Sequence, residues 1–170
     1  SDGDYYPWRL LEAVLRHAAC PVVVDADGIT LLSPHMDILR GRTAPTVLTP
    51  HDGEFARLFG PPGPDRMESA KRAAGESGSI VLLKGHRTCV TDGTRAFINP
   101  TGNPGMAVGG SGDVLAGIIT GLLGQGIAPL EAAALGAWLH GAAGDLCARE
   151  LGEYGMLPSD LLEALPRLLK

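Results

Sequence analysis

Short apolar segments that each run directly into a cluster of polar residues are the feature that most restricts the fold of this chain. Three of them, Val22–Val24, Pro45–Leu48 and Ile80–Leu83, have the length and the β-branched content of buried strands. Helical patterns separate them, which predicts an α/β protein with a mostly parallel sheet. Ligands bind beyond the carboxyl ends of the strands in such a sheet. The polar side chains that follow the strands should therefore meet at one edge: Asp25, Asp27, His51, Glu54 and Lys84.

Local signals also predict one hairpin and the helices. Two further strands, Thr88–Thr91 and Arg95–Ile98, are joined by Asp92-Gly93, and a long polar loop, Asn99–Ser111, follows them. Prolines at first helical positions and capping residues mark the helix starts. The expected helices are Pro7–Ala19, a segment ending at Leu58, Asp65–Glu76 capped by Asp65, Asp113–Leu123, an alanine-rich core helix over Pro129–Glu150, and Asp160–Leu169 capped by Ser159.

Composition excludes several classes of partner. The chain is 45% hydrophobic and 19% charged, so it can bury a core. Its 14 Lys and Arg against 19 Asp and Glu give a net charge of −5, and no basic cluster offsets it, so we expect no nucleic-acid partner. No apolar run reaches the length of a membrane span, and Cys20, Cys89 and Cys147 form no disulfide or zinc pattern. We therefore expect a cytoplasmic protein with no membrane partner and reduced thiols.

The glycine-rich segment Gly105–Gly117 is the most specific motif in the chain. Glycines let backbone N–H groups approach an anion, and the start of the following helix adds unpaired N–H groups and the positive end of its dipole. The residues that would form this anion hole are Gly109, Gly110, Ser111 and Gly112. No Lys-Ser or Lys-Thr pair follows the last glycine, so the segment is not a P-loop.

Three further polar residues each allow a catalytic and a structural interpretation. Asp113 either accepts a proton from an attacking hydroxyl or merely caps its helix. Lys84 either pairs with phosphate or is a surface lysine at a strand end, and His51 either contacts a ligand or is solvated. The remaining histidines have no zinc-ligand spacing: His17, His35, His86 and His140.

Four segments, taken in order, resemble the ADP- or ATP-dependent NAD(P)H-hydrate dehydratase family. They are VVDADG (23–28), VLTPHDGEFARL (47–58), VLLKGHRT (81–88) and NPTGNPGMAVGGSGDVLAG (99–117). The resemblance covers about residues 20–126 and continues more weakly beyond them. It implies a ribokinase-like fold, with helices on both faces of the sheet in three layers. Residues 1–170 would then be the C-terminal portion of a single such domain, incomplete at its N-terminus.

The resemblance implies repair chemistry on a nicotinamide nucleotide. The S-epimer of hydrated NADH or NADPH would lose water as ADP or ATP is split to phosphate and AMP or ADP. Asp113 would bind the hydrate and take the proton of its ring hydroxyl, and His51 would also contact the hydrate. The nucleotide-binding residues would be Lys84, Gly85, His86, Arg87, Thr88 and Gly112. Glu54 would hold Mg²⁺ through water, as in related kinases.

The family domain normally carries further strands before the region that matches this chain. A sheet edge and an apolar helix face would otherwise stay uncovered, so we expect an N-terminal segment or a partner chain to complete the sheet, and we expect a homo-oligomer. Two other functions remain open: a kinase of a small vitamin-precursor alcohol, and a non-catalytic nucleotide-binding subunit. The residues do not distinguish ADP from ATP, or NADH hydrate from NADPH hydrate.

Overall fold

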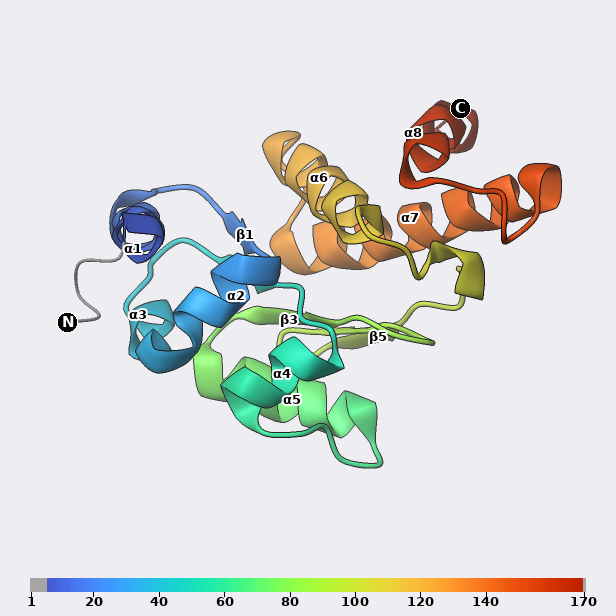
Figure 1. The fold of residues 1–170 in the computed structure, drawn as a ribbon. Coiled ribbons are helices and arrows are strands. Elements are labelled where there is room, and N and C mark those ends of the chain that lie inside the picture. The colour runs from blue at the N-terminus through green and yellow to red at the C-terminus, as the bar shows by residue number, and fades with distance from the viewer. Residues whose placement is uncertain (1–5, 170) are drawn as a thin grey trace.

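A five-stranded sheet forms the centre of the molecule. In the computed structural model, which describes residues 6–169, the strands lie side by side in the order of the chain. β1 (Val22–Val24), β2 (Thr46–Leu48) and β3 (Ile80–Leu83) are parallel. β4 (Cys89–Thr91) and β5 (Ala96–Ile98) form the predicted hairpin, antiparallel to β3 (Figure 1). The predicted α/β sheet, mostly parallel, is therefore confirmed.

Alternate residues of the strands enter two separate cores. One core contains five strand residues and is covered by helices α1–α5; the other contains their neighbours and is covered by α6 and α7. Side chains of a strand point to opposite faces in turn, so a wholly apolar strand requires helices on both sides. The first set is Val24, Leu48, Val81, Leu83 and Cys89; the second is Val23, Val47, Ile80, Leu82 and Val90. The three-layer arrangement is confirmed.

The helices divide between the two faces as their positions in the chain require. On the first face lie α1 (Tyr6–His17), α2 (Ala26–Leu32), α3 (Asp37–Arg40), α4 (Asp52–Phe59) and α5 (Arg66–Ser77). On the second lie α6 (Ser111–Gly124) and α7 (Pro129–Leu151), with α8 (Pro158–Leu168) packed outside them. Short 3₁₀ helices span Ser33–His35 and Pro104–Met106. Figure 1 shows the two helical layers on either side of the strands.

Several helix starts differ from the prediction. Residues 26–40 form α2 and α3, which the sequence pattern did not predict because this stretch mixes polar and apolar residues without a clear period. α6 begins at Ser111 instead of Asp113, since Gly110 (φ 92°) makes the turn into the helix. α8 begins at Pro158, a favoured first position, and Ser159 is not its cap. The N–H of Leu157 donates to Asp160 Oδ2 at 2.7 Å instead.

Small residues along α7 permit unusually close packing. A Cβ at Gly136 would lie 2.6 Å from Ile119 Cγ1 of α6. At Gly141 and Gly144 it would overlap Thr101 and Met106, which belong to the loop before α6. The helix also packs on the sheet through Leu130 and other apolar residues. α7 is therefore a core helix, as predicted, and the support on which α6 and its preceding loop rest.

The edge strand β1 departs from the expectation of a fully buried strand. Val22 and Val23 are only half-buried, because within residues 6–169 β1 pairs with β2 alone. Cys89 and Cys147 are buried and Cys20 is exposed, and all three are free thiols. Burial raises the pKa of the Cys89 and Cys147 thiols, which keeps them protonated. Nowhere in the described part of the chain is a helix long and apolar enough to cross a membrane.

Candidate active site

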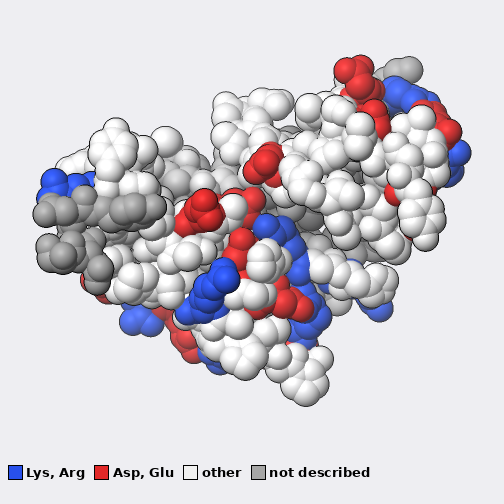
Figure 2. All heavy atoms as spheres, in the orientation of Figure 1, with Lys and Arg blue, Asp and Glu red and all other residues white. Residues whose placement is uncertain are grey.

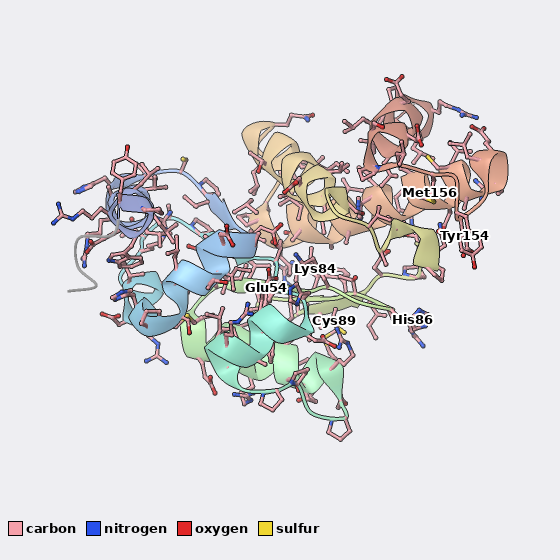
Figure 3. The ribbon with its side chains drawn as sticks, viewed as in Figure 1. Glu54, Lys84, His86, Cys89, Tyr154 and Met156 are labelled. Atoms are coloured by element: carbon pink, nitrogen blue, oxygen red, sulfur yellow. The ribbon has the colours of Figure 1, made fainter. Side chains whose placement is uncertain are left out.

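The carboxyl ends of the three parallel strands bring together most of the polar residues that the sequence indicated. Lys84 follows β3, and its ammonium lies 2.7 Å from Asp25 Oδ1, directly after β1, and 3.6 Å from Glu54 Oε2 in α4. All three side chains are mostly buried, at 22%, 13% and 8% exposed. Figure 3 shows Glu54 and Lys84 side by side near the centre of the molecule. The surface interpretation of Lys84 is thus wrong. Asp27, by contrast, lies exposed in the first turn of α2.

The charge balance of this cluster is negative. Two carboxylates share one ammonium, and the space-filling view shows acidic and basic side chains gathered in the hollow at the centre of the face (Figure 2). Mg²⁺ is typically held by one or two carboxylates together with waters and substrate phosphates. No cluster of three or more metal-ligating side chains occurs within residues 6–169. Asp25 and Glu54 therefore fit a magnesium ion bound mainly through water and phosphate, and not an all-protein cage.

His51 is the N-cap of α4. Its Nδ1 accepts hydrogen bonds from the N–H groups of Gly53 (2.9 Å) and Glu54 (3.3 Å), while Glu54 Oε2 accepts from the N–H of His51 at 2.8 Å. Accepting at Nδ1 places the proton of a neutral ring on Nε2. The imidazole is 57% exposed, with Nε2 3.5 Å from Glu54 Oε1. The same ring thus organises the helix start and presents an N–H edge to solvent.

The segment after Lys84 forms a tight turn with backbone conformations that few residue types adopt. Gly85 has φ 150°, and a Cβ there would lie 2.7 Å from Arg66 Nη2. Arg87 has a left-handed φ of 58°, and Thr88 Oγ1 donates to the carbonyl oxygen of Gly85 at 3.0 Å. His86 and Arg87 are exposed, and Figure 3 shows His86 well away from Lys84. The turn therefore presents backbone groups near Lys84 and side chains further out.

Arg66, which no sequence pattern indicated, helps to hold the residues of this site in place. Its Nη1 donates to Asp52 Oδ1 at 2.6 Å and its Nη2 to the carbonyl oxygen of Lys84 at 2.8 Å. It thereby ties the start of α5 to the start of α4 and to the end of β3. No local signal could have identified it, because its partners lie 14 and 18 residues away along the chain.

The predicted anion hole lies directly against this cluster. A Cβ on Gly112 would lie 3.5 Å from Asp25 Oδ2 and 3.7 Å from Lys84 Nζ. Gly109 and Gly110 are exposed, and Gly110 through Gly112 supply the first N–H groups of α6. Such N–H groups have no partner within a helix and carry partial positive charge, although that of Ser111 donates to the carbonyl oxygen of Val108 at 3.3 Å. Gly112 thus brings the start of α6 next to Lys84 and Asp25.

Asp113 is the third residue of α6 and does not cap it. The N-cap is Gly110, no side chain caps this helix end, and the Asp113 side chain is exposed. The capping interpretation is therefore wrong, and the carboxylate is free to act on a ligand beside the loop. It is one of the residues that line a cavity of about 440 Å³, open to solvent, between α6 and α8. The rest of that cavity is lined by Val114, Gly117, Ile118, Leu162 and Leu165.

The loop that leads to the anion hole is fastened along α7. Asn99 Nδ2 donates to the carbonyl oxygen of Ala137 (3.1 Å) and Thr101 Oγ1 to that of Trp138 (3.0 Å). Asp145 then accepts from the N–H of Gly102 and from Asn103 Nδ2, both at 3.0 Å. The sequence predicted only a polar loop here. Its attachment to α7, and the role of Asp145, appear only in the tertiary structure.

Comparison with known proteins gives a consistent result. Residues 4–167 match the family of NAD(P)H-hydrate dehydratases. A bifunctional NAD(P)H-hydrate repair enzyme of Moorella thermoacetica is 51% identical over 167 residues, which are 95% of this chain and 31% of the relative.

Solved structures agree with the sequence matches. An ADP/ATP-dependent NAD(P)H-hydrate dehydratase of Bacillus subtilis, co-crystallised with ATP and Mg²⁺, superposes with a TM-score of 0.76 at 35% identity, over 89% of this chain and 55% of that one. A ribokinase-like superfamily protein of Enterococcus faecalis V583 gives 0.80 at 36% identity, over 95% and 57%. These likenesses confirm the ribokinase-like fold. The chain spans less than two thirds of each of these three relatives.

Proposed function

Because the chain belongs to the NAD(P)H-hydrate dehydratase family, we propose that it carries the nucleotide-binding and catalytic part of an enzyme that dehydrates hydrated NADH or NADPH. ADP or ATP is the co-substrate, and the products are NAD(P)H, phosphate and AMP or ADP. In this proposal residues 1–170 form the C-terminal portion of a single ribokinase-like domain. One observation carries it: an exposed carboxylate, Asp113, stands next to an anion hole that adjoins a half-buried lysine, Lys84.

The proposed reaction begins with a proton transfer to Asp113. As the ring hydroxyl of the S-epimer loses its proton to this carboxylate, its oxygen attacks the terminal phosphorus of the nucleotide. A new O–P bond forms, and the bond to the AMP or ADP oxygen breaks. The ring then expels phosphate, and loss of a proton from the neighbouring ring carbon restores the double bond. Phosphate is a far better leaving group than hydroxide, which is why nucleotide cleavage promotes the loss of water.

The surrounding residues have roles that follow from their positions. The N–H groups of Gly109, Gly110, Ser111 and Gly112 would stabilise the charge that develops on the phosphoryl oxygens. Lys84, the turn Gly85–Thr88 and Gly112 would together hold the nucleotide. His86 and Arg87 would contribute mainly through the backbone of this turn, in which Arg87 has a left-handed φ of 58°. His51 would offer its Nε2–H edge to the hydrate.

Magnesium fits the carboxylates described above. Glu54, with Asp25 beside it, would hold the ion through water at the edge of the sheet. When bound, the ion neutralises phosphate charge. Lys84 exchanges part of its pairing with these carboxylates for pairing with phosphate as the nucleotide enters.

Completion of the sheet belongs to the same proposal. β1 has an open edge within residues 6–169, and the apolar side chains of Tyr6, Leu10 and Val14 are exposed along α1. Unpaired strand edges and exposed apolar helix faces are normally covered. We propose that a further polypeptide segment or a partner chain covers them. We also propose that the protein forms a homo-oligomer.

The deciding experiment uses the full-length protein with NADH hydrate, Mg²⁺ and either ADP or ATP. Recovery of the near-ultraviolet absorbance of NADH reports dehydration, and phosphate release is measured in parallel. Asp113→Asn should lower turnover by at least about 100-fold, the usual contribution of a general base, while nucleotide still binds. Asp37→Asn, an exposed aspartate in the first turn of α3, is the matched control and should keep full activity.

Two results would contradict the proposal. One is nucleotide binding with no recovery of NADH from either nucleotide. The other is transfer of the phosphoryl group to a stable phosphorylated alcohol in place of phosphate release, which would indicate a kinase.

A further inference from the structure

The anion hole contains one side chain that can fix its shape. Three of the four residues Gly109–Gly112 are glycine, and glycine leaves the backbone free to adopt many conformations. Preorganised N–H groups stabilise a transition state only if their direction is set before the reaction. Among these four residues, Ser111 is therefore the one whose side chain can hold the N–H groups in place.

Ser111 points into the protein and meets His140 of α7. The residue is 6% exposed, and its hydroxyl lies 3.1 Å from His140 Nε2. No side-chain cap bond exists at the start of α6, so this hydroxyl does not serve the helix end, the usual task of a serine there. Its contact with a different helix instead links the loop to α7.

His140 can make this contact without adding charge to the site. Burial lowers its pKa to about 4, and the nearby Lys84 ammonium acts in the same direction, whereas the contact with Ser111 acts against them. The ring is therefore neutral at pH 7. α7 also carries the attachments of Asn99, Thr101 and Asn103, so one helix holds the loop at both of its ends.

We propose that His140 is a positioning residue, which through Ser111 holds the N–H groups of Gly109–Gly112 in the direction that phosphoryl binding requires. This inference rests on the proposed function, because it assigns the loop to the phosphoryl group of the nucleotide. His140 touches neither substrate nor nucleotide in this scheme. Its effect is transmitted through the Ser111 hydroxyl.

The test compares four variants of the full-length protein: Ser111→Ala, His140→Leu, His140→Gln and the double variant Ser111→Ala/His140→Leu. Turnover with NADH hydrate, the KM for the hydrate, and the ADP dissociation constant by calorimetry are measured for each. His35→Leu, which removes a histidine stacked on Trp8 in the other core, is the control for lost stability.

Ser111→Ala and His140→Leu should each lower kcat by about 100-fold, the effect of a displacement of about 1 Å at a reacting centre, with little change in the KM for the hydrate. The double variant should be no worse than either single one, because both remove the same link. His140→Gln should recover part of the loss, since its amide nitrogen reaches the position of Nε2. His35→Leu should keep kcat.

Other outcomes would overturn the inference. These are losses in kcat that multiply in the double variant, or variants that unfold more readily but turn over at the normal rate. If the unaltered protein binds ADP without turnover, the proposed function fails separately. The ADP dissociation constant then decides: a non-additive weakening of about ten-fold in the variants supports the link between His140 and the loop, and unchanged affinity refutes it.

Discussion

Replacing Lys84 by methionine should destabilise the protein markedly in the absence of any ligand. At 2.7 Å from Asp25 the ammonium has a Coulomb energy of about 6 kcal/mol at an effective dielectric constant of about 20, before desolvation is subtracted. Breaking a buried ion pair by removing one partner costs about 3–5 kcal/mol, because the other charge stays buried and unpaired. Since these side chains are 8–22% exposed, some solvent screening remains. We expect a loss of about 3 kcal/mol in the free energy of unfolding.

Urea denaturation at pH 7 measures this loss, and a second substitution tests its cause. Asp25→Asn should destabilise the protein when Lys84 is present, but should have no effect or stabilise it in the Lys84→Met background, where the carboxylate lacks a partner. Lys71→Met is the control, because Lys71 pairs with Glu68 on the exposed face of α5 and should change stability little.

Either of two results would contradict this coupling between Lys84 and Asp25. Lys84→Met could leave the free energy of unfolding within about 0.5 kcal/mol of the original, which is the range of an ordinary surface change. Alternatively, Asp25→Asn could have the same effect in both backgrounds. The second result would show that the two side chains are not energetically coupled, whatever their distance.

Two further predictions concern α7. Folding lowers the pKa of His140 from 6.5 to about 4, so between these pH values the unfolded state binds more protons and stability should fall as the pH falls. At pH 5 this histidine should lower the free energy of unfolding by about 2 kcal/mol relative to pH 7.5. Urea denaturation of His140→Gln should not show this decrease. Asp145→Ala leaves the N–H of Gly102 and the amide of Asn103 without their acceptor, so it should destabilise the protein by about 1–3 kcal/mol and lower turnover. Hydrogen exchange at the Gly102 N–H should become faster, and exchange as slow as in the original protein would contradict this prediction.

Local patterns were sufficient for the strands and for most helices. The apolar runs at 22–24, 45–48 and 80–83 and the Asp92-Gly93 turn predicted the five strands of the sheet, the second of them one residue too long at its start. The Asp65 cap is also confirmed, with its Oδ1 accepting from the N–H of Glu68 at 3.0 Å. These signals act over a few residues, so they are present in the chain before it folds. The start of α6 was misplaced by two residues because glycines have no clear helical preference, and the backbone of Gly110 sets the boundary.

The candidate site was only partly accessible from the sequence. Strand order and chain direction were enough to predict that Asp25, Glu54 and Lys84 would meet. Their actual pairing joins residues 59 positions apart and depends on the register of β1, β2 and β3. Whether Asp113 caps its helix or faces a ligand also depended on the turn that precedes α6.

Local patterns in the sequence therefore specify the strands, the glycine-rich loop and the chemical groups available to the site. Which further residues hold these groups in place depends on tertiary packing. Arg66 reaches the carbonyl of Lys84, Asp145 fastens the loop, and His140 meets Ser111 across 29 residues. None of these contacts leaves a local pattern, because each depends on how two elements pack and not on the residues next to it. Gly136, Gly141 and Gly144 let other segments approach α7 closely, and this close approach brings Asp145 to the loop and His140 to Ser111.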